Sequence, residues 1–189
     1  MNFVLFALVA IVAGVVIVLF NRLIGLRNAA TAAWSDIDVQ LKRRHDLVEN
    51  LVEAVKGYSS YERATLERIT EARGRAVEAL GSGDAARAGE AEGRLSGGVR
   101  QLFALAEAYP DLKASERFLD LQRALVDLEN DIQNARRYYN AVVRDLNTRV
   151  QSFPDLLVAR TLGFHERPFF ELESTAEAAV PRAEVEGGS

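Results

Sequence analysis

Residues 3–20 read FVLFALVAIVAGVVIVLF, and none of these 18 side chains is charged. At a rise of about 1.5 Å per residue, a helix of this length spans roughly 27 Å, close to the ~30 Å hydrocarbon core of a bilayer. The stretch is apolar on every face, whereas the surface helix of a soluble domain has a polar face. The sequence therefore predicts a transmembrane anchor over residues 1–22, through which the chain contacts the lipid bilayer.

A cleaved signal peptide is the alternative interpretation of this stretch. Signal peptides carry a basic segment, a shorter apolar core and a cleavage site with small residues. Here only Met1 and Asn2 precede the apolar run, and the Asn21-Arg22-Leu23 that follows it is not a cleavage site. These flanks and the length of the run favour an anchor that stays attached.

Basic residues gather on one side of the predicted span. Arg22 and Arg27 follow it closely and Lys42, Arg43 and Arg44 come next, whereas the other side has only the terminal amine. The positive-inside rule then places the domain in the cytoplasm and the N-terminus outside, as a single-pass protein of the cell membrane. The chain has no cysteine, so it forms no disulfide, which fits a reducing compartment.

Composition favours helices throughout. Alanine, leucine, glutamate and arginine dominate, and runs of β-branched residues are confined to the anchor. The formal net charge is −4, and residues 166–189 hold six acidic and two basic residues, which accounts for all of it. No basic stripe of the kind that binds nucleic acid is present, so we expect no nucleic-acid partner. The acidic segment 166–189 is predicted to be a mostly disordered tail.

Apolar residues recur every three or four positions, the spacing of packed helices and coiled coils. The pattern predicts four helices, over residues 23–56, 61–80, 85–108 and 116–150. The last is nearly unbroken over four heptads from Phe118 to Leu146, and Phe153-Pro154 opens a further short helix that Gly163 closes. The predicted fold is therefore all-α: an N-terminal transmembrane helix that continues into an antiparallel up-and-down four-helix bundle, residues 23–165.

The third predicted helix begins with several glycines after Asp84, a suitable N-cap. Gly89, Gly93 and Gly97 are four residues apart, a spacing that lets another helix approach closely. The alternative is a weak, mobile helix start, because each glycine costs up to about 1 kcal/mol relative to alanine. We favour the second interpretation because these residues lie outside the predicted span.

An up-and-down order brings the end of the fourth helix back towards the bilayer. Phe153, Phe164, Phe169 and Phe170 are then expected near the lipid interface. Such an aromatic group contacts either lipid or the base of the first helix, and packing against protein is the more common case.

One position in the apolar pattern of the first helix is charged. Arg44 stands between Leu41 and Val48, and a buried arginine requires a partner. The pattern predicts a polar layer or interaction site formed by Arg43, Arg44, His45, Asp46, Asn50, Glu129, Asn130, Asn134, Tyr138, Tyr139 and Asn140. A layer that sets the register of the helices is favoured; a pocket that senses a small ligand or signal is the alternative.

Motifs of catalysis are missing. The chain has no cysteine nucleophile, no Gly-x-Ser-x-Gly and no phosphate-binding loop. Lys42 replaces the glutamate that a di-metal Glu-x-x-His motif would place before His45. We expect no enzyme activity, metal or cofactor, but a scaffold or protein-interaction module for membrane or cytoplasmic proteins, with self-association as a further possibility.

Several blocks of sequence are shared with one family. They read AWSDIDVQLKRRHDL at 33–47, AEAYPDLKA at 106–114, LEN at 128–130, YN at 139–140 and FFE at 169–171. With these blocks the chain resembles the LemA family of bacterial membrane proteins, although Glu49 stands where many relatives carry proline. The resemblance implies an N-terminal span and a helical-bundle domain, and it implies no particular reaction, because the family has no agreed biochemical activity.

Overall fold

The structure is a computed structural model that describes residues 2–57 and 62–172. Its helices are α1 (Asn2–Lys56), α2 (Arg63–Gly81), α3 (Ala85–Ala106), α4 (Pro110–Lys113), α5 (Glu116–Gln151) and α6 (Asp155–Leu162). The described residues contain no strand, which confirms the predicted all-α class. The predicted start of the second helix at Tyr61 lies outside the described residues.

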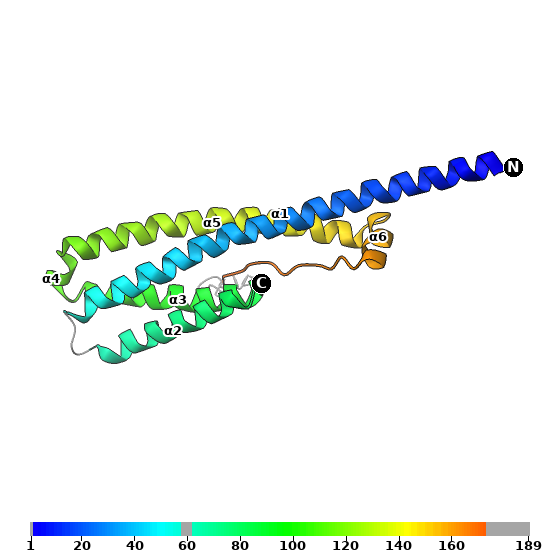
Figure 1. Ribbon diagram of the computed structural model, residues 1–189. Helices are drawn as coiled ribbons and strands as arrows, with labels where there is room; N and C mark the ends of the chain where they lie inside the picture. Colours follow the sequence, from blue (N-terminus) through cyan, green and yellow to red (C-terminus); the bar gives the residue numbers. More distant parts are fainter. Residues whose placement is uncertain (1, 58–61, 173–189) are drawn as a thin grey trace, which may run out of the picture.

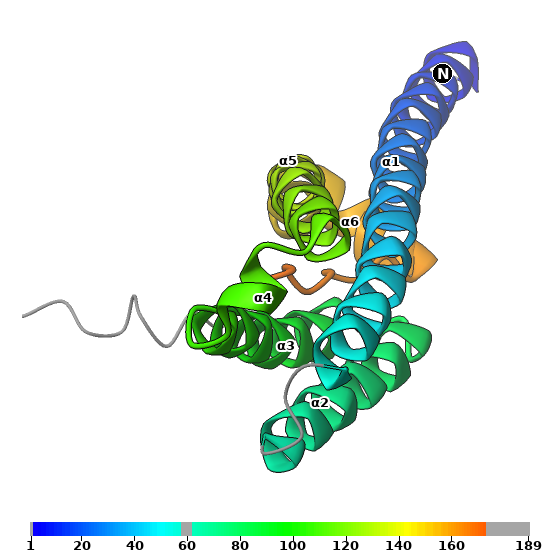
Figure 2. The same cartoon turned by 90° about the vertical axis from the view of Figure 1, so that its left-hand side faces the viewer.

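Four long helices lie side by side, and helices that follow one another in the chain run in opposite directions (Figure 1). Helix α1 packs along α5, α2 packs along α3, and α1 also contacts α2. Figure 2, seen from the end of the molecule opposite the N-terminus, shows α5, α3 and α2 beside the half of α1 that lies away from the N-terminus. We call residues 23–57 and 62–172 the helical body.

Helix α1 belongs to both parts of the molecule. Its first residues project alone beyond α6 (Figure 1), and an 18-residue window of mean hydropathy 3.3 has no buried residue. From Leu23 onward the same helix contributes buried side chains at Ala30, Ala33, Ile37 and Leu41. The described residues thus contain one helix that is long and apolar enough to cross a membrane, and it continues unbroken into the core.

The apolar core consists of two clusters arranged along the helix axes. The cluster nearer the apolar end of α1 includes Ile37, Leu41, Leu128 and Ile132. The farther cluster includes Val48, Leu51, Val55, Leu95, Leu102 and Leu125. On α1 the first cluster ends at Leu41 and the second begins at Val48, the interval that contains Arg44.

Local sequence signals account for the helix ends. The Asp84 side chain accepts hydrogen bonds from the backbone N–H groups of Ala86 (2.9 Å) and Arg87 (3.3 Å), so it caps α3 as expected. Ser115 occupies the N-cap position of α5 without a side-chain bond. The sequence analysis did not predict α4, in which Pro110 begins a single turn. A proline at the first position suits a helix because its missing N–H needs no partner there.

The chain reverses after α6 and runs back along the helical body as an extended segment, residues 163–172, which we call the strap (Figure 1). Gly163 begins it with a φ of 72°, a left-handed conformation that closes α6. The side chain of Asn147 exchanges two 2.9 Å hydrogen bonds with the backbone of Arg167. The side chain of Asn140 does the same with Phe170, at 3.0 and 2.9 Å.

The spacing of these two asparagines matches that of the strap. Seven residues of α5 separate Asn147 from Asn140 and rise about 10.5 Å, while three extended residues from Arg167 to Phe170 span about 10 Å. Each asparagine amide therefore pairs with one backbone unit of the strap, as a neighbouring strand would. Residues 166–172, which the sequence analysis placed in the tail, belong to this segment, and residues 173–189 lie outside the described residues.

The predicted aromatic group divides into two. Phe164 packs edge-on against Phe20 at 5.9 Å between ring centroids, at the end of the apolar stretch. Phe170 instead packs against Trp34 at 5.8 Å, and Trp34 lies 14 residues beyond Phe20, or about 21 Å along the helix. Phe164 and Phe170 thus both pack against residues of α1, the more common case named above, and the strap carries Phe170 away from the end of α6.

Gly89 lies where the strap passes over α3. A Cβ atom at this position would stand 2.1 Å from the backbone carbonyl oxygen of Glu171, whereas one at Gly97 would meet nothing within 4 Å. The close-approach interpretation therefore holds at Gly89, although the neighbour is the extended strap and not a helix. The prediction of a mobile helix start is not tested.

We predict that Gly89→Ala destabilises the protein by about 1–3 kcal/mol, the usual effect of inserting a methyl group where there is no room. Gly97→Ala is the matched control, and it should stabilise α3 by up to about 1 kcal/mol through helix propensity alone. Thermal unfolding of both variants, followed by circular dichroism, measures the difference. Equal shifts in Tm for the two would contradict the close contact.

Candidate functional site

A buried set of charged and polar side chains fills the space between the two apolar clusters. Arg44 of α1 bonds through Nη1 to Oε2 of Glu92 on α3 (3.2 Å) and through Nη2 to Oγ of Ser96 (2.7 Å). Its Nη2 also lies 3.3 Å from Oε2 of Glu129 on α5. His45 Nε2 lies 2.5 Å from the second oxygen of Glu92. We call these five residues the ionic layer.

The ionic layer is closed to solvent at its centre. Arg44 is 4% exposed, His45 3% and Glu92 0%. An isolated charge in such a place carries a large desolvation penalty, and mutual pairing with hydrogen bonds offsets it. Both carboxylate oxygens of Glu92 are engaged, and since a carboxylate paired with arginine only accepts, Nε2 of His45 is the donor. Glu129 is a third exposed, so its contribution is weakened by solvent screening.

Helix α2 is tied to the same level of α1. Nε of Arg73 donates to the backbone carbonyl of His45 at 3.1 Å, and its Nη2 pairs with Oε2 of Glu49 at 2.5 Å. The ionic layer and this bond together connect α1 to each of the other three long helices. This arrangement suits the predicted role of a layer that sets the axial register of the helices, as buried polar positions do in coiled coils.

The sequence analysis predicted Arg44, His45 and Glu129 but missed Glu92 and Ser96. The predicted partners of Arg44 all lay on the fourth helix, and the glycine-rich start of the third helix was interpreted as weak. A usable signal was present, because Glu92 continues the three-and-four spacing of the buried positions Ala85, Ala88, Leu95, Val99 and Leu102. A charged residue in that row is expected to be buried and paired.

The remaining predicted site residues lie outside the ionic layer. Three are exposed on α1: Arg43, Asp46 and Asn50. Three others are exposed on α5: Asn130, Asn134 and Tyr138. Tyr139 and Asn140 face the strap instead. The predicted set thus divides into a buried layer, two outer surfaces and a strap contact.

Tyr139 links α1, α5 and the strap. Its ring packs against Trp34 at 5.4 Å between centroids, and its hydroxyl donates to the carbonyl oxygen of Pro168 at 3.0 Å. Burial raises the pKa of Tyr139 above its ordinary value, Arg167 acts in the opposite direction, and Asp84 adds to the rise. The neutral phenol is therefore the form that suits the folded protein.

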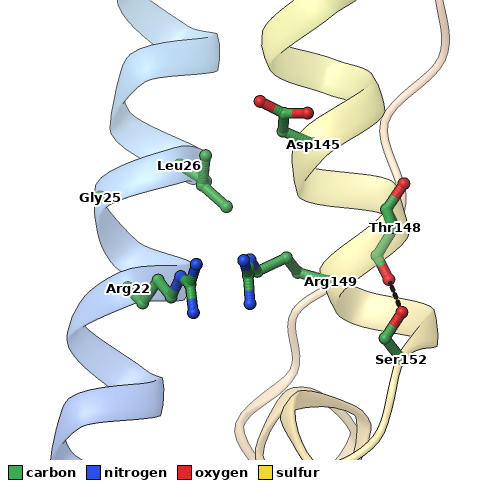
Figure 3. Close-up of a pocket in the computed structure, with 7 residues that line it drawn as sticks. All are labelled: Arg22, Gly25, Leu26, Asp145, Thr148, Arg149 and Ser152. Carbon is green, nitrogen blue, oxygen red and sulfur yellow. Dashed lines mark hydrogen bonds between the residues drawn. The ribbon is translucent and has the colours of Figure 1, made fainter.

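Two surface grooves lie beside α5. The first, of about 580 Å³, lies between α1 and α5 and is lined by Arg22, Gly25, Leu26, Asp145, Thr148, Arg149 and Ser152 (Figure 3). The second, of about 410 Å³, includes Arg136, Arg137 and Arg144 beside Phe170. In the part of the chain that the structure describes, no group of three or more histidine and acidic side chains could hold a metal ion.

These features define an all-helical protein whose longest helix has an apolar end and a buried ionic layer farther along. Residues 33–184 match the LemA family, and the chain belongs to that family. The match includes Arg44, Glu92 and Glu129, and also the strap. Family membership agrees with the resemblance found from the sequence blocks.

Curated relatives are distant in sequence but cover most of the chain. Magnetosome protein MamQ of Magnetospirillum gryphiswaldense is 24% identical over 184 residues, which cover 85% of this chain and 68% of the relative. Protein LemA of Metamycoplasma hominis is 26% identical over 170 residues, covering 87% and 74%. Magnetosome protein MamQ 1 of Paramagnetospirillum magneticum is 21% identical over 184 residues, covering 85% and 68%.

We predict that Arg44→Ala destabilises the helical body by about 3–5 kcal/mol, because it leaves Glu92 buried without its cation. Arg43→Ala is the matched control: the neighbouring arginine is exposed, and its loss should change stability by no more than about 0.5 kcal/mol. Chemical denaturation of both variants gives the comparison. An Arg44→Ala protein as stable as Arg43→Ala would contradict a structural layer.

Tyr139 makes stability sensitive to alkaline pH. Because its folded-state pKa is raised, its contribution is present in full below the unfolded value of about 10 and is lost as pH rises through the folded value. We predict that Tyr139→Phe removes this alkaline loss and about 1 kcal/mol of hydrogen-bond stability at neutral pH. The control Tyr138→Phe, at an exposed site, should retain the alkaline loss when unfolding is measured against pH.

Proposed function

We propose that this protein is a non-enzymatic interaction module anchored in the cell membrane by residues 3–20, with the helical body in the cytoplasm. The continuity of α1 carries this proposal. A scaffold needs a fixed geometry relative to the membrane, and a span that is also a core helix provides one. A flexible linker between anchor and domain would leave that geometry undefined.

The comparisons support a membrane-associated role. The chain belongs to the LemA family, and two of the relatives named above are magnetosome proteins. Basic residues beside the apolar stretch, Arg22 and Arg27, support a cytoplasmic helical body through the positive-inside rule.

The ionic layer supports a structural rather than a sensing role. Arg44 reaches Glu92, Ser96 and Glu129, so both of its terminal nitrogens, Nη1 and Nη2, already have partners within the protein. A ligand would have to displace these partners and leave Glu92 uncompensated. This cost favours the outer surface over the layer as the site of recognition.

The outer face of α5 offers chemistry that suits a protein partner. Val126, Asn130, Asn134 and Tyr138 stand four residues apart and are exposed, with Val126 at 54% and Tyr138 at 58%. Arg137 is exposed beside them and hydrogen-bonds to Asn134. Tyrosine and arginine are the residues that most often dominate binding energy at interfaces. The proposed partner is a membrane or cytoplasmic protein, and a second copy of the chain is included among the candidates.

We predict that a photo-crosslinking amino acid at Tyr138, introduced into the full chain in native membranes, gives discrete crosslinked products. The same group at Arg87, exposed on α3, is the matched control and should give none of those products. Mass spectrometry of the products identifies a partner protein or a second copy. Crosslinks to lipid alone at Tyr138, or the same products from both positions, would argue against an interaction surface on α5.

A further inference from the structure

We propose that the groove between α1 and α5 binds the phosphate group of an anionic phospholipid through Arg22 and Arg149. The inference rests on the proposed membrane anchoring and adds a lipid ligand to it. It concerns a site separate from the ionic layer and from the outer face of α5.

The two arginines converge on one point. Figure 3 shows the guanidinium groups of Arg22 and Arg149 pointing towards each other across the groove. Arg149 has a partner in Asp155, although at 3.6 Å, and Arg22 forms no ion pair within residues 2–57 and 62–172. Two cations that face each other repel unless an anion lies between them. The groove, about 580 Å³, has room for such an anion.

The position of the groove identifies the source of the anion. Arg22 follows the last apolar residue of the span, Phe20, by two residues, which is about 3 Å along the helix. The headgroup layer on each side of the hydrocarbon core is several ångströms thick, about 5–8 Å. Arg22, and with it Arg149 across the groove, therefore lies at the depth of lipid phosphates.

Apolar side chains at the same end of the helical body fit a lipid environment. Phe153 is 79% exposed, Leu157 59% and Leu162 49%. They lie on α6 and in the turn before it, and Phe164, just after α6, contacts Phe20 of α1. Large exposed apolar residues beside paired arginines suit an interface where acyl chains and headgroups meet.

The chemistry of the groove favours a phosphate at its membrane side. Planar guanidinium groups offer paired N–H donors that match phosphate oxygens. Asp145, one helical turn farther from the span than Arg149, places a negative charge at the other end of the groove (Figure 3). The Ser152 hydroxyl already donates to the Thr148 carbonyl at 2.6 Å, and the two arginines are the positively charged donors among the residues that line the groove.

The test measures lipid bound to the full chain, purified in detergent, by native mass spectrometry. Phosphatidylglycerol, with one negative charge, and zwitterionic phosphatidylcholine are added at equal concentration. We expect preferential binding of phosphatidylglycerol, and a loss of about fivefold in the bound-to-free ratio for Arg22→Gln and for Arg149→Gln. Arg160→Gln on α6 is the matched control, since it removes the same charge from an exposed site outside the groove, and it should leave the ratio unchanged.

Arg149→Lys guards against a folding effect, because Arg149→Gln also leaves Asp155 unpaired. The lysine keeps the charge and the pairing with Asp155, yet it loses the planar pair of donors and should still weaken lipid binding. Thermal unfolding of each variant shows whether the body remains intact. Arg22→Gln disturbs no ion pair of the described residues and tests the groove independently.

Three outcomes would overturn the inference: no preference for phosphatidylglycerol, an equal loss with Arg160→Gln, or full competition by soluble glycerol 3-phosphate at matched concentration. The last would assign the groove to a free phosphate compound. Alkaline extraction of native membranes separates this failure from that of the proposed function. A chain that resists extraction but shows no lipid preference removes the lipid site alone, whereas an extracted chain removes the anchor as well.

Discussion

The pairing of Arg44 with Glu92 is the constraint on which the rest of the helical body depends. A guanidinium and a carboxylate that are almost wholly buried tolerate little axial displacement, because a slip of one residue along α1 would separate them and strand both charges in the core. Apolar side chains alone would accept several registers, since leucine and valine pack against one another with little directional preference. The two apolar clusters therefore hold the helices together, and the charged level between them decides how the helices align.

The strap is a second place where specific polar contacts align two segments of the chain, this time at the surface. Two asparagines of α5, Asn140 and Asn147, bind the backbone of the strap through reciprocal hydrogen bonds. Through these bonds α5 holds the strap in an extended conformation. This pairing depends on backbone groups of the strap and on the spacing of the asparagines. Packing of Phe170 against Trp34 and the absence of a side chain at Gly89 allow the strap to lie close to the helices. The blocks of sequence that carry the family resemblance meet here: YN at 139–140 binds FFE at 169–171.

Helical periodicity was sufficient to predict the class of fold, the extent of α5 and the burial of Arg44, because each depends on a local three-and-four pattern. It was not sufficient for Glu92, the partner from α3, since glycine and alanine dilute the apolar signal of that helix. Helical periodicity also could not predict the path of the chain after α6. Residues 166–172 have the composition of a tail, and their order comes from two asparagine side chains that lie 20 and 30 residues away in sequence from the backbone groups they bind. A contact between segments that are distant in sequence produces no periodic sequence pattern in either segment.

The unbroken course of α1 has a mechanical consequence. With about 100° of rotation per residue and no break in α1 between Phe20 and Arg44, the rotation of the helical body about the helix axis is fixed relative to the apolar residues 3–20. Any rotation or piston movement of that segment turns or lifts every surface of the domain together, by the same angle and the same distance. In the membrane-anchored arrangement that we propose, a neighbouring protein that binds residues 3–20 would therefore determine which face of the helical body is presented to a partner.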